Sequence, residues 1–361
     1  MSGGLFELRR DDVTGWWVAV VVDREFERHR FALPAGSTGI GPDSCPNCRI
    51  PPGGGVRVRE LKPFAFSVAG DRRPTARTIT PSQASMLDAA DPDLGLVGEC
   101  GSWQTIVAPP GHHMSLAETS PSLVFQMLAR ARAAIVSARS RNQTEYLQVV
   151  QNWGTQAGAR TDHLCFDFYD LPQIPHRIGE ELGGAARYLI REGVCPYCRL
   201  LLDEVEDGAR LVFQDASSVC FAPYASRSPF ELWVVPRHHD ADFARATDEQ
   251  LTSAAATLRR VLGMLDVLDG PPYNLVLHTA PLRERVDETY HWHWEIHPRL
   301  REIAGLELGT GLPVNPVSPE EAAEELLATA GARSPEDAGA EAGVSRSGAR
   351  DWDAFLREAA G

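Results

Sequence analysis

The stretch Tyr290-His291-Trp292-His293-Trp294-Glu295-Ile296-His297-Pro298-Arg299 alternates strictly between polar and bulky apolar side chains. This alternation predicts a β-strand, whose successive side chains point to opposite faces. One face carries His291, His293 and Glu295, spaced about 7 Å apart along the strand. The other face carries two tryptophans and an isoleucine, which can pack into a core. Because imidazole serves as metal ligand, general base or nucleophile, the polar row predicts a functional site.

The length, hydrophobic content and net charge of the chain favour some classes of protein and exclude others. The chain has 361 residues, enough for two domains or one internally duplicated unit, and 43% of them are hydrophobic, enough for a packed core. The net charge of -14 argues against sequence-independent binding of nucleic acid, which needs a basic face. No apolar run approaches the length of a membrane span and no basic stretch precedes an apolar one, so we expect neither a membrane span nor a signal peptide. We therefore expect a cytoplasmic protein without a membrane partner.

An internal duplication is indicated by features that recur in the same order. Each half begins with a Cys-x-x-Cys pair, continues with a proline-containing turn that ends in two histidines, and then has a helix and an alternating strand with a histidine. In the first half, His112 and His163 are 51 residues apart, and in the second half, His239 and His291 are 52 residues apart. Agreement in order and in spacing predicts two copies of one structural unit.

Local signals place the helices and the boundaries of the two copies. Ser120-Pro121 is a typical helix start, and we expect a helix over residues 121–140. Thr247 to Gln250 resembles a capping box, which predicts a helix that continues to Leu268. Strands and helices therefore form an α+β fold. The predicted parts are a first half over 1–170, a connection over 171–193, a second half over 194–330, and a largely disordered tail over 331–361 with a short amphipathic helix over Trp352–Ala360.

The cysteine pairs and the histidines predict two zinc sites. In a cytosolic chain, Cys-x-x-Cys indicates a metal site more than a disulfide, and structural zinc takes four Cys and His ligands. The sequence leaves open which histidine of His112/His113 and of His238/His239 is the ligand. The predicted ligands are Cys45, Cys48, His112 and His163 in the first half, and Cys195, Cys198, His239 and His291 in the second.

Further motifs carry a resemblance to a known family: Leu8-Arg9-Arg10-Asp11, Cys45-Pro46-x-Cys48, Asn152-x-Gly154-x-x-Ala157-Gly158-Ala159, Pro223-Tyr224-Ala225-Ser226-Arg227, Leu277-His278-Thr279-Ala280-Pro281 and Gly309-Thr310-Gly311-x-x-x-Asn315-Pro316-Val317. Together with the histidine strands, they resemble the galactose-1-phosphate uridylyltransferase family of the histidine-triad superfamily, over about residues 8–328. The two zinc sites resemble its ADP-glucose-phosphorylase-like branch. The resemblance implies a duplicated histidine-triad-like fold, with two antiparallel half-barrel sheets and packed helices. It also implies transfer of a nucleotide through a nucleotidyl-histidine.

The first half departs from the family pattern at the nucleophile. The family has His-Pro-His-x-Gln, in which the second histidine attacks and the glutamine binds the phosphate. Here the corresponding residues are His163-Leu164-Cys165-Phe166-Asp167. Cys165 therefore stands where the attacking histidine is expected, and Asp167 stands where the glutamine is expected. A carboxylate beside a phosphate repels it unless the charge is neutralised.

Three interpretations of this departure remain open. Cys165 is the nucleophile, with a cation such as Arg160 lowering its pKa. Alternatively, the reaction has moved to the second half, where His293 attacks and Glu295 or His278 orients it. In the third interpretation, the first centre is inactive, and the protein binds nucleotide sugars without transforming them or acts as a scaffold.

The resemblance also implies partners and further contacts. The expected partners are a nucleotide sugar and a sugar phosphate or phosphate, and the chain is expected to be able to form a homodimer. His278 and His293 with Glu180 or Glu181 form an alternative third metal site, as an iron site does in some family members. The implied substrate-binding residues are Arg9, Arg10, Asn152, Gly158, Asn274, Thr310, Gly311 and Asn315.

Overall fold

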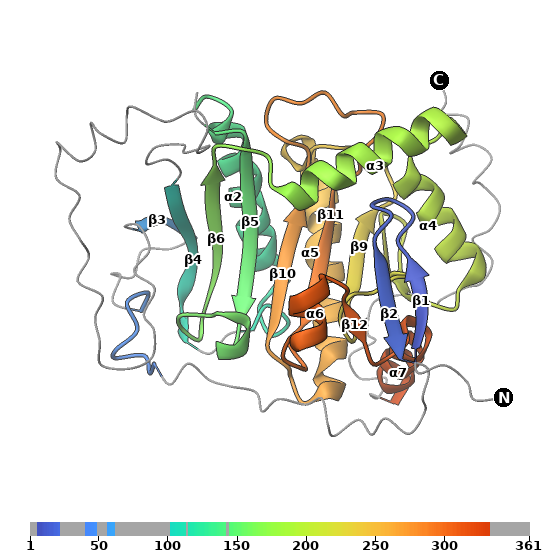
Figure 1. The fold of residues 1–361 in the computed structure, drawn as a ribbon. Helices are drawn as coiled ribbons and strands as arrows, with labels where there is room; N and C mark the ends of the chain where they lie inside the picture. Colours follow the sequence, from blue (N-terminus) through green and yellow to red (C-terminus); the bar gives the residue numbers. More distant parts are fainter. Residues whose placement is uncertain are drawn as a thin grey trace.

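The fold is built on one large antiparallel sheet (Figure 1). The computed structural model describes residues 6–21, 40–48, 56–61, 102–112, 115–141 and 144–332. The sheet has nine strands in the order β3-β4-β6-β5-β10-β11-β9-β8-β7. Its strands are β3 (Arg57–Leu61), β4 (Ser102–His112), β5 (Tyr146–Trp153), β6 (His163–Leu171), β7 (Leu211–Gln214), β8 (Ser218–Phe221), β9 (Leu232–Pro236), β10 (Tyr273–His278) and β11 (His293–Pro298). A smaller sheet has the order β1-β2-β12, from β1 (Phe6–Arg10), β2 (Trp17–Val21) and β12 (Val314–Asn315).

The strand order confirms the duplicated α+β fold. From the centre of the large sheet outwards, β5, β6, β4 and β3 of the first half correspond to β10, β11, β9 and β8 of the second. At the junction Val150 lies opposite Val276, and each also pairs with the acidic residue of its own half, Asp167 or Glu295. The sheets of the two halves therefore join edge to edge through β5 and β10, about an approximate twofold axis.

Two helices, α2 (Pro121–Ala138) and α5 (Asp248–Met264), contact each other and lie behind the sheet in Figure 1. Both start as the sequence predicts, since Ser120 caps α2 and Thr247 forms a capping box on α5. The predicted second helix is too long, because the chain tightens into the 3-10 helix η5 (Leu265–Leu268) and leaves it through a left-handed residue, Asp269.

The hydrophobic core fills the space between these helices and the sheet. Phe166 and Phe168 of β6 and Trp294 and Ile296 of β11 are fully or almost fully buried in one continuous cluster. Their polar neighbours along each strand point to the opposite face of the sheet. The alternation that the sequence shows within Tyr290–Arg299 therefore divides the core from the polar face. The predicted strand is too long at its start, because β11 begins at His293 and His291 lies before it.

The polar face of the second half is covered by other elements. The helix α3 (His176–Glu192) and the β1–β2 hairpin lie in front of it in Figure 1. Gly184 of α3 lies so close to the hairpin that a Cβ would stand 1.8 Å from the Val13 carbonyl oxygen, so this contact requires glycine. The helices and 3-10 helices not yet placed are η3 (Thr155–Ala157), α4 (Pro196–Asp207), η4 (Phe243–Arg245), α6 (Gly305–Thr310) and α7 (Pro319–Ala332).

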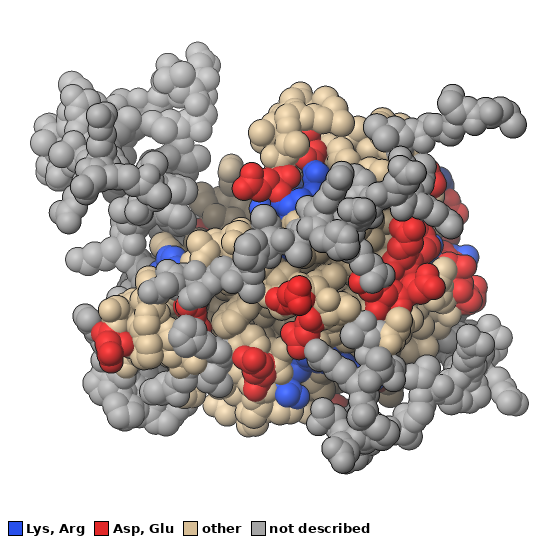
Figure 2. Space-filling view, turned by 90° about the horizontal axis from the view of Figure 1, so that it is seen from below, with Lys and Arg blue, Asp and Glu red and all other residues tan. Residues whose placement is uncertain are grey.

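The helix α4 is a feature that the sequence analysis does not predict. It starts directly after Cys195, has proline as its first residue, and ends at the left-handed Gly208. Among the described residues, no helix is both long and apolar enough to cross a membrane. The face in Figure 2 carries many acidic side chains, in keeping with the net charge of -14. Most of the predicted tail lies outside the described residues.

Candidate functional site

The first cysteine pair lies against two histidines in a compact cluster. The ligand atoms of Cys45, Cys48, His112 and His163 all lie within 4.8 Å of one another. The Cys48 sulfur is 3.3 Å from Nδ1 of each histidine. The outer nitrogens point to backbone carbonyls, with His112 Nε2 2.6 Å from Ile40 O and His163 Nε2 3.0 Å from Ala108 O. His112 is therefore the member of its pair in the cluster, and His113 lies outside the described residues.

The second cluster repeats this arrangement. Cys195, Cys198, His239 and His291 also have their ligand atoms within 4.8 Å of one another. The Cys198 sulfur is 3.2 Å from Nδ1 of His239 and 3.8 Å from Nδ1 of His291. The neighbouring His238 is exposed, and its Nδ1 faces the His239 carbonyl oxygen. His239 is therefore the residue of this pair that reaches the cluster.

Both clusters fit a tetrahedral metal ion. A four-coordinate zinc with ordinary bond lengths has sulfur and nitrogen ligands about 3.6 Å apart. The distances in the second cluster, 3.2 and 3.8 Å, bracket that value, and the two distances of 3.3 Å in the first cluster lie close to it. In three of the four histidines, Nε2 meets a carbonyl oxygen, which fixes Nδ1 as the nitrogen that faces the ion. The two sites can therefore each hold a metal ion with closed, structural coordination.

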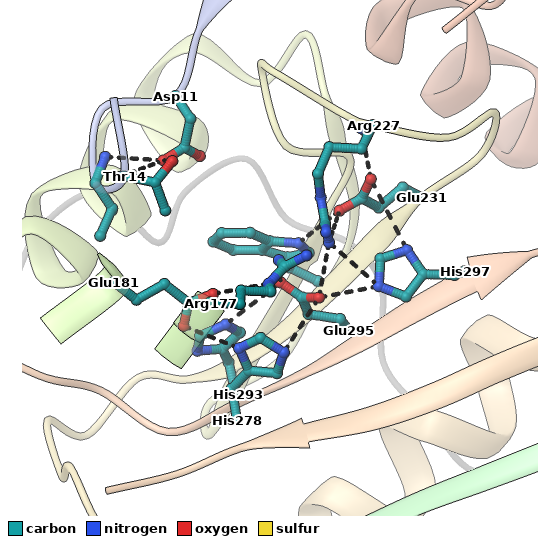
Figure 3. A network of polar contacts seen from close by, with 12 residues as sticks. Asp11, Thr14, Arg177, Glu181, Arg227, Glu231, His278, His293, Glu295 and His297 are labelled. Carbon is teal, nitrogen blue, oxygen red and sulfur yellow. Dashed lines mark hydrogen bonds and ion pairs between the residues drawn. The ribbon is translucent and has the colours of Figure 1, made fainter. Parts of the chain in front are cut away.

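The polar face of the second half carries a dense network of buried charges around Glu295 (Figure 3). Its two carboxylate oxygens receive Arg177 at 2.7 Å, Arg227 at 2.9 Å and His297 at 2.9 Å. Burial alone would raise the pKa of Glu295, but Arg177 and His278 outweigh it and hold the pKa well below its usual value. Glu295 is therefore a permanent anion that is already fully paired.

A second buried carboxylate, Glu181, extends this network to α3. Arg177 donates to it at 3.0 Å, and His278 Nδ1 lies 2.9 Å from it. The other ring nitrogen of His278 faces Glu295 at 3.3 Å. Burial opposes ionisation, but His278 and Arg177 lower the pKa of Glu181 to about 2. Glu181, His278 and His293 have ligand atoms within 4.8 Å of one another, as the expected third metal site requires, and both ring nitrogens of His278 face carboxylates.

His293 is enclosed in the centre of this half. Its ring stacks on Trp233 at 4.8 Å and lies 5.2 Å from Tyr197 and 4.9 Å from His278, measured between ring centroids. The side chain has no exposed surface, and Nδ1 donates to the His291 carbonyl oxygen at 2.9 Å. A cavity beside the network has a volume of about 20 Å³, which suits a water molecule rather than a nucleotide.

The equivalent position of the first half is more open. Cys165 corresponds to His293 and is only partly buried, and Asp167 corresponds to Glu295. Arg160 donates to Asp167 at 3.0 Å and lies over the Trp103 ring, 4.1 Å from its centroid. Burial, reinforced by Asp167, raises the pKa of the Cys165 thiol to about 12, so the thiol is protonated at neutral pH.

A glycine turn and two asparagines border this first-half centre. Asn152 is the last residue but one of β5 and lies on the same face of the sheet as Cys165, and the turn that follows contains Gly158 in a left-handed conformation. A Cβ at Gly158 would meet no atom within 4 Å, so the space beside it is open. Asn274 reaches this region from β10, where it lies in register with Asn152.

The remaining predicted substrate-binding residues make structural contacts. Arg9 is buried and ion-paired with Glu320 at 2.9 Å, while Arg10 donates to the Gly15 carbonyl oxygen. The last three, Thr310, Gly311 and Asn315, lie at the end of α6 and on β12: Thr310 bonds Leu306 O, Gly311 is the left-handed helix cap, and Asn315 donates to Ser226 O. None of the contacts given by the described residues joins them to Cys165.

The residues that close the second-half centre are not among those predicted from the sequence. Arg177 and Arg227 are 118 and 68 residues away from Glu295, and Tyr197 and Trp233 come from two further elements. A local signal exists for the arginines, since each precedes a glutamate by four residues and pairs with it.

Comparison with known proteins gives relatives over most of the chain, although no family model matches it. The chain is 28% identical to ADP-glucose phosphorylase of Arabidopsis thaliana over 335 residues, which cover 89% of this chain and 92% of that protein. It is 29% identical to galactose-1-phosphate uridylyltransferase of Thermotoga maritima over 194 residues, which cover 51% of this chain and 60% of that protein.

Solved structures agree with these relatives. The crystal structure of ADP-glucose phosphorylase from Arabidopsis thaliana with bound ADP-glucose has a TM-score of 0.69, at 26% identity, and covers 89% of this chain and 98% of its own. A uridylyltransferase structure has a TM-score of 0.66, at 26% identity, and covers 89% of this chain and 97% of its own. The chain is thus similar, in sequence and in fold, to enzymes that transfer nucleotides.

Proposed function

We propose that this protein is a nucleotidyltransferase that acts on the phosphoanhydride of a nucleotide sugar, in the manner of the two-zinc, ADP-glucose-phosphorylase-like branch. The observation that carries the proposal is the likeness to ADP-glucose phosphorylase over 92% of that protein's length, including a structure that holds ADP-glucose. The acceptor is phosphate or a sugar phosphate. Two zinc ions are assigned to the two Cys/His clusters, where they hold the ends of the histidine strands.

The contrast between the two centres supports the first half as the place of reaction. In the second half, His293 has no exposed surface and Glu295 is fully paired. In the first half, Cys165 is partly exposed, and the space beside Gly158 is open. We therefore assign the substrate to the Cys165 centre and a structural role to His293.

With Cys165 as nucleophile, two displacements complete the reaction. Its sulfur attacks the α-phosphorus, forms a sulfur–phosphorus bond and breaks the bond to the bridging oxygen, which leaves with the sugar phosphate. The thiol proton passes to the leaving phosphate or to water. An acceptor phosphate oxygen then attacks the same phosphorus and releases the thiolate. Since the pKa of the thiol is raised to about 12, the attack requires that the bound substrate favours loss of this proton.

The same pKa favours a second candidate function, the binding of nucleotide sugars without catalysis. A protonated thiol is a poor nucleophile, and the alternative nucleophile, His293, is enclosed by aromatic rings. In this case the zinc clusters and the fold are kept, and the Cys165 centre retains only its binding role.

A trapping experiment separates these functions. Wild-type protein is incubated with UDP-glucose and with ADP-glucose, each labelled at the α-phosphate, then denatured and examined for covalent label. Label that is lost in Cys165→Ala and kept in the matched variant Cys220→Ala, a buried thiol on β8, supports the sulfur nucleophile. If the label is instead lost in His293→Gln, at an unchanged melting temperature, then His293 of the second half is the nucleophile. Binding without label or exchange supports the silent homologue, and absence of binding, label and exchange refutes the proposed function for these substrates.

A further inference from the structure

The junction between the two halves contributes a side chain to the border of the Cys165 centre. Asn274 belongs to the second half, but it lies in register with Asn152 across the β5–β10 pair. Its Nδ2 donates to Asn152 Oδ1 at 2.7 Å and to Ala157 O at 2.7 Å. Both amide hydrogens of Asn274 are therefore directed at oxygen atoms of the first half.

The bond from Asn274 to Asn152 fixes the orientation of the Asn152 amide group, that is, which way its oxygen and its nitrogen point. An asparagine side chain presents an oxygen acceptor on one side and two N–H donors on the other. Because Asn274 binds the oxygen of Asn152, the Asn152 Nδ2 points away from the junction. The register of β5 and β6, carried two residues beyond Val150 and Asp167, sets Asn152 level with Cys165.

The second bond holds the glycine turn in place. The amide hydrogens of Ala157, Gly158 and Ala159 bond within the turn, to Gly154 O or Thr155 O. The Ala157 carbonyl oxygen is bound by Asn274. A single side chain therefore links the Asn152 amide to the turn that borders the open space beside Gly158.

We propose that Asn274 is a positioning residue, which makes Asn152 present an N–H donor rather than an oxygen to the phosphoryl oxygens of the substrate. This inference rests on the proposed function and deepens it, since phosphoryl oxygens only accept hydrogen bonds and an exposed amide oxygen would repel them. It also replaces the expectation that Asn274 itself contacts the substrate.

The variant Asn274→Asp replaces the hydrogen-bond donor of this contact by an acceptor, and the side chain keeps nearly the same volume. A carboxylate accepts hydrogen bonds, so it repels Asn152 Oδ1 and favours the flipped Asn152 amide, with its oxygen towards the substrate. The matched control is Gln148→Glu, at the other end of the same strand pair, where Gln148 donates to the Leu277 carbonyl oxygen. Both variants turn an amide into an acid at the β5–β10 junction, but only the first lies at the Cys165 centre.

Calorimetric binding of ADP-glucose and UDP-glucose, and of adenosine and uridine, tests the proposal on full-length protein of verified zinc content and melting temperature. We expect Asn274→Asp to weaken binding of the nucleotide sugar that wild type prefers by about ten- to a hundredfold. Nucleoside binding and the melting temperature should change little, and Gln148→Glu should bind as wild type does. Equal affinity of wild type and Asn274→Asp, or an equal loss for nucleoside, overturns the positioning role. If Asn274→Asp does not fold, Asn274→Leu, which removes the donors without adding charge, must still weaken nucleotide-sugar binding selectively. If wild type binds no nucleotide sugar, the proposed function fails and the inference fails with it.

Discussion

Replacement of Arg177 by methionine tests the assignment of the second-half centre to structure rather than chemistry. Arg177 is the positive charge shared by the two buried carboxylates, Glu181 and Glu295, at 3.0 Å and 2.7 Å. Methionine keeps much of the volume of the side chain but removes the charge and the donors. Both carboxylates are almost without exposed surface, so they cannot exchange Arg177 for water.

The magnitude follows from what remains around the two carboxylates. Removal of one partner of a buried ion pair typically costs about 3–5 kcal/mol. The lower end of this range applies here, because Glu295 is still paired with Arg227 and Glu181 with His278 in the variant. The Arg177 side chain is also 26% exposed. We expect a loss of about 3 kcal/mol in the free energy of unfolding, with a fall in melting temperature of roughly 5–10 °C.

Thermal and denaturant unfolding, followed by circular dichroism, measure this loss. Arg187→Met is the matched control, since Arg187 is exposed on the same helix, and it should change stability by no more than about 0.5 kcal/mol. A melting temperature of Arg177→Met equal to that of the control would refute the assignment of Arg177 as the cation on which this half depends.

Three further predictions concern metal, pH and charge. Metal analysis of purified protein should find two zinc ions per chain, falling to one in Cys48→Ser and in Cys198→Ser, because each thiolate is one of four ligands. Glu181 has its pKa lowered from 4.5 to about 2, so its ionisation stabilises the fold fully above pH 4.5; this contribution should be lost as the pH falls from 4.5 towards 2, and the melting temperature of Glu181→Gln should depend less on pH in that window. Arg160→Ala should weaken nucleotide-sugar binding by about tenfold or more, since it leaves the Asp167 carboxylate unpaired beside the phosphate, and the added change Asp167→Asn should restore part of the affinity in a binding titration.

The members of the two Cys/His clusters could be predicted from the sequence because each cluster is built from short motifs. Cys-x-x-Cys brings two thiols together by local geometry alone, and the repeated spacing to the histidines then identifies the other two ligands. Only the choice within each histidine pair needed the structure. His112 and His239 reach the clusters, while His238 turns towards a backbone carbonyl.

The closure of the second-half centre could not be predicted in this way. Arg177 and Trp233 meet Glu295 and His293 only after α3 and β9 have packed against β11. A short sequence motif cannot predict such a contact, because the two residues that make it lie far apart in the sequence. The sequence presents His293 as an available imidazole, whereas the fold encloses it.

The two centres therefore show how one duplicated unit can serve two purposes. Each has a Cys/His cluster whose last histidine, His163 or His291, is followed two residues later by Cys165 or His293 and then by an acidic residue. His163 is the first residue of β6, whereas His291 lies just before β11. In the second half, the acid is Glu295, which is held by two arginines from other elements and is buried in the process. In the first half, the acid is Asp167, which is held by Arg160, a residue that remains 43% exposed. We therefore assign a structural role to the buried histidine strand of the second half and propose that it supports the more open first half through the β5–β10 pair and Asn274.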